Sequence, residues 1–329
     1  MSLPFDCVVA VTYRCNSRCL MCNIWQDEHP DDLDVSLLAK LPASLRYINL
    51  SGGEPFLRKD LPEVVAAVRK ACPKADVIIS TNALVKRTRE TVARIREVDP
   101  GVGIAVSVDG LGATHDRVRG VQGAFERAVA LVRGLKEDGM RNIRLAFTVF
   151  DENVRDFHGV YRLSRELGVE FTSAVAQGSS HYFRGTGLRP VKPEELRREF
   201  NRVAADELRT TTAKRWARAY FTRGLHEFAS GAGRPLDCRA ADDFFFLSPA
   251  GDVYACNVLD ASLGNLRDAS FEEIWNSERA AEARRQVGAC GKGCWMVCTA
   301  RSAMKRSPLR VAGWVGAAKA RATLGKPVL

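Results

Sequence analysis

Hydrophobic positions in the first half of the chain follow two alternating periods. Short apolar runs rich in β-branched residues predict six strands, over 5–12, 46–50, 76–80, 102–108, 143–150 and 169–175. Between them, apolar residues recur at helical spacing and predict helices over 61–71, 87–96, 124–137 and 154–167. Strands that alternate with helices indicate parallel βαβ units and a sheet buried on both faces. We expect an α/β fold, an open or partial barrel whose ligands gather at the carboxyl ends of its strands.

The pattern changes after residue 187. Two charged amphipathic helices are predicted over 193–208 and 213–228, and a hairpin is predicted over 244–256, with its turn at Pro249 and Gly251. A further helix is predicted over 271–287, and a cysteine-rich segment follows at 290–298. We therefore divide the chain into a barrel (1–190), a helical connection (191–236), a small cysteine-rich domain (237–300) and a basic tail (301–329).

Composition and charge narrow the class of protein. Hydrophobic residues make up 46% of 329, and no apolar run approaches the roughly 20 residues of a membrane span. The first residues lack the basic region and the small-residue cleavage site of a signal peptide, so we expect a cytoplasmic protein. The net charge is +10, and the tail contributes +7 of it, because it contains seven Lys and Arg and no acidic residue. The rest of the chain therefore carries a net charge of +3. A near-neutral body disfavours a nucleic-acid groove.

Three cysteines follow the first predicted strand directly. Cys15, Cys19 and Cys22 have the spacing C-x3-C-x2-C, on a loop at the expected ligand end of the barrel. Cytoplasmic cysteines stay reduced, which favours metal ligation over a disulfide framework. A structural zinc site takes four ligands, whereas three thiolates leave one iron of a four-iron cluster open. We therefore predict an iron–sulfur cluster here.

The segment VTYRCNSRCLMCNIW (11–25) resembles the signature of the radical S-adenosylmethionine (SAM) superfamily, whose fold is a partial (β/α)6 TIM-type barrel. The resemblance implies that Cys15, Cys19 and Cys22 hold a [4Fe–4S] cluster whose open iron chelates S-adenosylmethionine. One electron from a flavodoxin- or ferredoxin-type donor then yields a 5′-deoxyadenosyl radical, which abstracts a hydrogen atom from the substrate. The backbone of Met21 is expected near the adenine.

Further motifs at the ends of strands two to four resemble the same family. They are SGGEP (51–55), STNA (80–83) and SVDG (107–110), and HDRVRG (115–120) follows. We expect the glycine pair to allow the backbone close to a ligand, Glu54 to lie near the methionine ammonium, and Arg119 to meet the methionine carboxylate. The cofactor contacts that the resemblance implies are Met21, Gly52, Gly53, Glu54, Ser80, Asn82, Ser107, Asp109 and Arg119.

A second group of cysteines lies near the C-terminus and consists of Cys238, Cys256, Cys290, Cys294 and Cys298. With G-x4-C at 251–256, it resembles the SPASM and Twitch extensions of the family, which carry auxiliary iron–sulfur clusters. A full SPASM has seven cysteines, so five favour one auxiliary [4Fe–4S] cluster on four ligands. Which two of the last three cysteines ligate it stays open, and a four-cysteine zinc site is the alternative. We expect Cys7 and Cys72 to pack at the bottom of the barrel.

The substrate is the least determined part of this interpretation. Gln177, Ser179, His181 and Tyr182 are candidates to line its pocket, although their loop (174–187) is equally typical of a surface connection. The first hypothesis is oxidation or epimerisation of a sugar, cyclitol or carrier-linked metabolite, and the short extension favours it. The second is a maturase that modifies a ribosomally made peptide, and the third is a non-catalytic iron–sulfur or zinc-binding protein. An epimerase would use the surplus cysteine of the last three as its hydrogen donor.

The basic tail carries an amphipathic pattern. Val311, Trp314, Val315 and Ala318 fall on one side of a helix predicted to begin at Pro308. One interpretation is a terminal helix that packs on the barrel with its basic side in water. The other is an interfacial helix on the anionic inner face of the membrane, which would favour a lipid-linked substrate.

Overall fold

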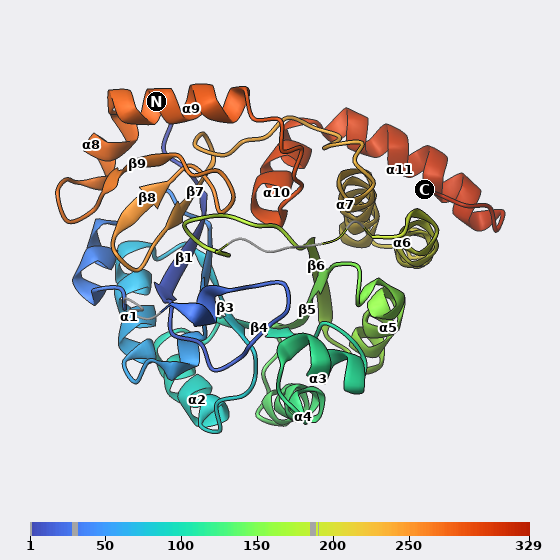
Figure 1. Cartoon of the computed structure of the whole chain (residues 1–329), viewed down its shortest axis with the longest axis horizontal. Helices are drawn as coiled ribbons and strands as arrows, with labels where there is room; N and C mark the ends of the chain where they lie inside the picture. The colour runs from blue at the N-terminus through green and yellow to red at the C-terminus, as the bar shows by residue number, and fades with distance from the viewer. Residues whose placement is uncertain (1, 28–31, 185–188, 190) are drawn as a thin grey trace.

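The computed structural model describes residues 2–27, 32–184, 189 and 191–329. Six parallel strands lie side by side in chain order, as the α/β partial-barrel prediction requires (Figure 1). Each predicted strand is present, with its ends shifted by two residues at most: β1 (Asp6–Thr12), β2 (Tyr47–Gly52), β3 (Asp76–Thr81), β4 (Gly103–Ser107), β5 (Ile143–Val149) and β6 (Glu170–Val175).

Helices cover the outer side of these strands (Figure 1). Each contributes the apolar side that its sequence period predicts: α1 (Leu61–Ala71), α2 (Thr88–Val98), α4 (Ala124–Glu137) and α5 (Phe157–Glu166). Shorter pieces complete the barrel half: η1 (Ile24–Gln26), η2 (Val35–Lys40), η3 (Pro55–Leu57), α3 (Ala113–Arg119) and η4 (Val154–Asp156). The sequence did not predict α3, because two turns between glycines at 112 and 120 are too short to show a period.

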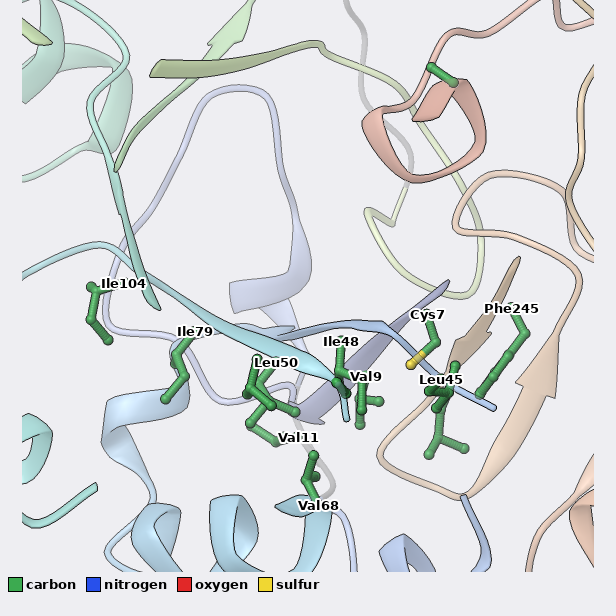
Figure 2. Packing of buried hydrophobic residues seen from close by; sticks show 14 of the residues in the cluster. Cys7, Val9, Val11, Leu45, Ile48, Leu50, Val68, Ile79, Ile104 and Phe245 are labelled. Atoms are coloured by element: carbon green, nitrogen blue, oxygen red, sulfur yellow. The ribbon is translucent and has the colours of Figure 1, made fainter. Parts of the chain in front are cut away.

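The cysteine-rich domain extends the sheet of the barrel. β7 (Phe244–Leu247) pairs with β1 in parallel, and β8 (Asp252–Tyr254) and β9 (Ser262–Asn265) follow antiparallel. Cys7 lies opposite Phe245 in this pairing, and Figure 2 shows the two side chains near each other in the core. The sequence predicted the hairpin but not its partner. Pairing with the buried FFFL strand satisfies the backbone groups of β1, which would otherwise form an exposed edge.

Between the sheet and the outer helices lies the largest hydrophobic cluster, part of which is seen in Figure 2. Val9, Ile48 and Ile79 project from neighbouring strands into it. Cys7 and Cys72 belong to the same cluster and are fully buried. Their predicted packing role is confirmed.

The open side of the barrel is covered by the C-terminal helices, namely α6 (Pro193–Leu208), α7 (Ala213–Ala229), α10 (Val297–Arg306) and α11 (Pro308–Thr323). The predicted single helix over 271–287 is wrong, because α8 (Phe271–Asn276) and α9 (Glu278–Gly288) are separate. Ser277 breaks the helix: its backbone is extended (ψ 161°), and its hydroxyl accepts the Ala280 amide as an N-cap. Buried apolar residues recur at helical spacing within each helix, but the apolar side changes by about half a turn at the break, from Ile274 and Trp275 to Ala280 and Ala283.

The basic tail forms the predicted helix, which packs on the protein. Ala318 and Ala322 of α11 are buried in an alanine-rich contact with α6 and α7. The Trp314 ring lies edge-on to Tyr220, with centroids 5.6 Å apart. The side that could have lain on lipid therefore faces α6 and α7. Among the described residues, no helix combines the length and the apolar character needed to cross a membrane.

Candidate active site

The loop that carries Cys15, Cys19 and Cys22 is held from both sides. The Arg18 and Leu20 amides donate to the carbonyls of Arg119 and Val118, at 3.0 Å each. On the other side, the Gly53 and Glu54 amides donate to the carbonyls of Thr12 and Arg14, at 2.8 Å each. The motifs after β2 and β4 therefore position the cysteine loop as well as the cavity beside it.

The glycine pair has a role that the sequence did not predict. A Cβ atom on Gly52 would lie 2.1 Å from the Thr12 carbonyl oxygen, and one on Gly53 would lie 2.1 Å from that of Arg14. The missing side chains thus allow close contact with the cysteine loop. Both glycines also line the cavity, and the expectation that they let the backbone approach a ligand stays a prediction.

A cavity of about 340 Å³ begins at the cysteine loop and continues into the barrel. All three cysteines line it. Of the predicted cofactor contacts, seven also line it: Met21, Gly52, Gly53, Ser80, Asn82, Ser107 and Arg119. Inward-facing strand residues form the rest of the wall, among them Val8, Asn49, Ala105, Ala146 and Thr172.

Glu54 and Asp109 lie behind the cavity wall, and both are fully buried. Glu54 accepts hydrogen bonds from the Phe56 and Asn82 amides (3.1 and 2.6 Å) and from the Thr81 hydroxyl (3.0 Å). Burial raises its pKa to about 7, against the effect of these donors. Glu54 therefore ties β2 to β3, and the expectation that it lies near the methionine ammonium stays a prediction.

Asp109 holds the guanidinium of Arg119 in a buried ion pair. Its other oxygen accepts the Thr148 amide at 2.6 Å. Burial raises the pKa of Asp109, and the Arg119 charge opposes that shift. Asp109 is thus a positioning residue for Arg119, which itself lines the cavity beside the cysteines.

The donor set of the loop fits a [4Fe–4S] cluster. Burial raises the pKa of Cys15 to about 12 and that of Cys22 to about 11, so these thiols hold their protons until a metal displaces them. Arg119 Nη1 lies 3.5 Å from Cys19 Sγ. No three His, Cys, Asp or Glu side chains in the described part of the chain form a ready ligand set for a single metal ion. The assignment therefore rests on the loop motif and on the shared cavity.

Four of the five C-terminal cysteines form one electrostatic group. Burial raises the pKa of Cys294 to about 12, with smaller contributions from Cys238, Cys256 and Cys290. Cys256 likewise interacts with Cys238 and Cys290. Cys298 also has Cys256 among its neighbours, but its principal charged neighbours are Asp6 and Arg301, and it lines the barrel cavity. This grouping favours the first four cysteines as the ligand set, and the choice among the last three stays a prediction.

The predicted substrate residues divide into two pairs. Gln177 and Tyr182 line the barrel cavity, where the Tyr182 hydroxyl lies 3.0 Å from that of Ser51. Ser179 instead accepts the Phe183 amide within its own loop. His181 Nε2 lies 3.0 Å from the Cys256 carbonyl, and its ring stacks on Tyr254 of the cysteine-rich domain. Residues 185–187 of this loop lie outside the described residues.

Sequence reasoning missed a second cavity, of about 790 Å³, between β6, α7, α10 and α11. It shares five wall residues with the barrel cavity, so the two adjoin: Arg144, Thr172, Ser173, Val297 and Arg301. Most of its other wall residues are apolar. The available signal was Arg144, the one charged residue in a strand predicted to be buried on both faces.

Comparisons with known proteins agree with the barrel and with the cysteine-rich domain. The family model described as the radical SAM superfamily matches residues 9–164, and SPASM, an iron–sulfur cluster-binding domain, matches residues 238–299. Fe-coproporphyrin III synthase of Methanosarcina barkeri is 29% identical over 299 residues, which cover 80% of this chain and 72% of that protein. Mycofactocin maturase MftC of Mycolicibacterium smegmatis is 29% identical over 308 residues, which cover 88% of this chain and 75% of that protein.

A solved structure shows the same fold. The protein described as native anSMEcpe with bound AdoMet superposes with a TM-score of 0.61 at 16% identity, and the match covers 95% of this chain and 99% of that one. The similarity spans the barrel, the helical connection and the cysteine-rich domain. The whole chain therefore follows one known architecture.

Proposed function

The chain belongs to the radical SAM superfamily and carries a SPASM-type domain, and from this premise we propose that it is a maturase that removes a hydrogen atom from a carbon of a peptide. Its cofactors are S-adenosylmethionine, a [4Fe–4S] cluster and an auxiliary iron–sulfur cluster. When bound, they supply a 5′-deoxyadenosyl radical. The chain's own residues hold the cofactors, orient the substrate and exclude water.

The observation that carries the peptide proposal is the apolar second cavity. Its wall includes Phe171, Trp216, Phe221, Val311 and Val315. Charged side chains also line this cavity, among them Glu170, Glu207 and Arg218. A peptide with apolar and charged side chains fits such a wall, whereas a sugar or cyclitol would leave the apolar part of the wall uncovered. The similarity to a maturase favours the same alternative over the metabolite hypothesis that the sequence first favoured.

Within this proposal, the residues around the cysteine loop have different roles. Cys15, Cys19 and Cys22 would hold the cluster, and Arg119 would meet the carboxylate of the methionine group. Gln177 and Tyr182 would orient the substrate, because both face the barrel cavity from the loop after β6. The reducing electron would come from a flavodoxin- or ferredoxin-type donor.

A carboxylated tetrapyrrole is the second candidate substrate. Two arginines, Arg144 and Arg301, stand where the apolar cavity meets the barrel cavity, an arrangement suited to a large apolar ligand that carries carboxylates. A relative of similar identity is named Fe-coproporphyrin III synthase. The two candidates differ in size and rigidity, so they can be separated with defined compounds.

Anaerobically reconstituted enzyme tests the proposal directly. We would supply S-adenosylmethionine and dithionite, and compare a short peptide encoded beside the gene, iron-coproporphyrin III and myo-inositol. We expect the peptide to accelerate 5′-deoxyadenosine release and to change mass. The Cys15→Ala variant, which lacks one cluster ligand, is the matched control and should do neither.

The other arms give the contrary outcomes. Acceleration by iron-coproporphyrin III alone would replace the peptide with the tetrapyrrole. Acceleration by myo-inositol alone would restore the metabolite hypothesis and contradict our interpretation of the apolar wall. Equal, slow cofactor cleavage with all three compounds would contradict both candidates.

A further inference from the structure

Arg144 projects from β5 into the junction of the two cavities without a charged partner. Its Nη2 donates to Asn142 Oδ1 at 2.9 Å, but its Nε is buried and has no hydrogen-bond partner. In the described part of the chain, no carboxylate lies within ion-pair distance of this guanidinium. A buried charge with an unused donor is costly unless a ligand pairs with it.

Arg301 reaches the same junction from α10. Its Nη1 lies 2.8 Å from Asp6 Oδ2, and its guanidinium lies 4.0 Å from the centre of the Tyr47 ring. These contacts fix its position and leave its remaining donors available to the cavity. Lys305, one turn further along α10, also lies over Tyr47 and lines the second cavity. Asp6 pairs with Arg301, and Asp76 lies close enough to Arg144 to favour its charged form. Glu170, opposite Arg144 in the β5–β6 pairing, is already paired with Lys214 and Arg218. The basic side chains therefore still outnumber the acidic ones at the junction.

The two guanidinium groups repel each other, and the positive charge of Arg301 adds to burial in lowering the pKa of Arg144. Two cations that face one cavity are stabilised when an anion binds between them. Arginine presents a planar set of donors that matches a carboxylate in a bidentate manner. The site therefore selects a planar anion in preference to a neutral group.

We propose that Arg144 and Arg301 form a binding site for a carboxylate of the substrate, whose apolar part lies in the second cavity. This inference rests on the proposed function, because it names the substrate group that the same active site recognises. A peptide C-terminus and a propionate side chain of a tetrapyrrole carry the same group. The catalytic experiment below distinguishes the peptide C-terminus from the tetrapyrrole propionate.

The carboxylate of S-adenosylmethionine is a poor occupant of this site. Arg144 is the second residue of β5, and Thr148 lies four residues further along, near the cysteine loop end. Four residues of a strand span about 13 Å. Arg119, beside Cys19, stands at that far end. The proposed site would thus hold the substrate by a group distant from the cofactor and determine which carbon meets the radical.

Binding of defined amphiphiles tests the site without assuming any reaction. We would measure the affinity of reconstituted enzyme for dodecanoate and for dodecanol, which share an apolar chain and differ in charge. We expect wild type to bind dodecanoate at least about tenfold more tightly, as a charged hydrogen bond allows. Arg144→Gln should remove this preference and leave the affinity for dodecanol unchanged within about twofold.

Lys214→Gln is the matched control. Lys214 lines the same cavity, but its side chain is largely exposed and pairs with Glu170, so its loss should leave the preference intact. If Arg144→Gln does not fold, Arg301→Lys, which keeps the charge but loses the planar fork, should weaken dodecanoate binding alone. Equal binding of the two amphiphiles by wild type, or an undiminished preference in Arg144→Gln, would overturn the proposal.

Catalysis separates this site from the proposed function. With a peptide substrate, we expect Arg144→Gln to raise KM about tenfold for the free C-terminal acid and to leave the amidated peptide unaffected. The same comparison with iron-coproporphyrin III and its methyl ester reports the tetrapyrrole source. If neither compound reacts while dodecanoate binding still depends on Arg144, the peptide and tetrapyrrole proposals fail and the carboxylate site stands.

Discussion

The thiol of Cys298 lies in the first turn of α10, in surroundings unlike those of the other C-terminal cysteines. It contacts Val8 and Phe246 in a small apolar cluster and lines the barrel cavity. Burial and the neighbouring Asp6 raise its pKa well above the ordinary value, so it stays a neutral thiol. We therefore predict that Cys298 is not a ligand of the auxiliary cluster.

Iron content tests this assignment. Cys298→Ser should keep all the iron of the reconstituted enzyme, about eight atoms for two four-iron clusters. Cys290→Ser and Cys294→Ser should lose about four, because each removes a ligand of the auxiliary cluster. Iron analysis together with electron paramagnetic resonance of the reduced protein measures this. Loss of iron in Cys298→Ser with none in Cys290→Ser would reverse the assignment.

Prediction from sequence succeeded for residues whose roles depend on local spacing. Cys15, Cys19 and Cys22 and the strand-end motifs meet at one cavity because parallel strands end at one edge. Arg144 and Arg301 are 157 positions apart and were missed, because only the packing of α10 against the open barrel brings them together. The contact of Gly53 with the cysteine loop was missed for the same reason, since the carbonyl that it approaches belongs to Arg14.

At the scale of elements, the contact between α7 and the auxiliary cysteine segment is very close. A Cβ atom on Gly224 of α7 would lie 2.4 Å from Nε1 of Trp295, a buried residue next to Cys294. The same nitrogen donates to the Phe221 carbonyl at 3.1 Å. The position of α7 therefore sets that of the tryptophan and of the cysteine beside it.

Gly224→Ala should lower the urea midpoint of unfolding and the occupancy of the auxiliary cluster. Overpacking costs about 1–3 kcal/mol, more than the roughly 1 kcal/mol that alanine gains over glycine in a helix. Gly313→Ala in α11 is the control, because no atom lies within 4 Å of its Cβ position, and it should raise the midpoint. A Gly224→Ala protein as stable as wild type, with full iron, would show that the contact is not restrictive.

The link between β1 and α10 predicts a pH dependence. Burial raises the pKa of Asp6 from 3.8 to about 7, against the charges of Arg301 and Lys305. Between these two pH values the folded protein retains a proton that the unfolded chain has released. Stability should therefore fall as the pH rises through this window, by up to about 4 kcal/mol from this residue.

Urea midpoints measured between about pH 4 and pH 8 test this dependence. In the Asp6→Asn variant the urea midpoint should decline less steeply as the pH rises. Part of the decline should remain, because burial also raises the pKa of Glu54. Asp138→Asn is the control: Asp138 pairs with Arg89 at the surface, and its lowered pKa keeps it charged throughout. An identical decline in wild type and Asp6→Asn would contradict the prediction.

The ends of a helix or strand could be predicted where one regular spacing of apolar residues extended over that element and stopped at its ends. The strands and α1, α4 and α6 were found from their patterns because each buries one continuous side. The break at Ser277 was missed because apolar residues keep helical spacing on both sides of it, although the apolar side changes there. The pairing of β7 with β1 was also missed, since both strands are buried at every residue and such strands do not reveal their neighbours.

For the whole molecule, one nine-stranded sheet joins the barrel to the auxiliary domain, and the C-terminal helices close the side that six strands leave open. α11 is part of this closure. Its Val311, Val315 and Gly316 line the second cavity, and its alanines contact α6 and α7. The tail predicted as a separate basic segment is therefore a wall of the proposed substrate site.

This place in the molecule predicts how the tail behaves toward membranes. An interfacial helix binds lipid by inserting its apolar side, and in α11 that side is occupied by α6 and α7. Its exposed basic residues retain only an electrostatic attraction of about 1 kcal/mol each, which salt screens. In sedimentation with phosphatidylglycerol vesicles at high salt, the whole chain and a chain that ends at Ser307 should partition equally. The shortened chain should also unfold at lower urea and bind dodecanoate more weakly, because its cavity has lost a wall. Preferential sedimentation of the whole chain that persists at high salt would show instead that α11 leaves the protein to enter the lipid surface.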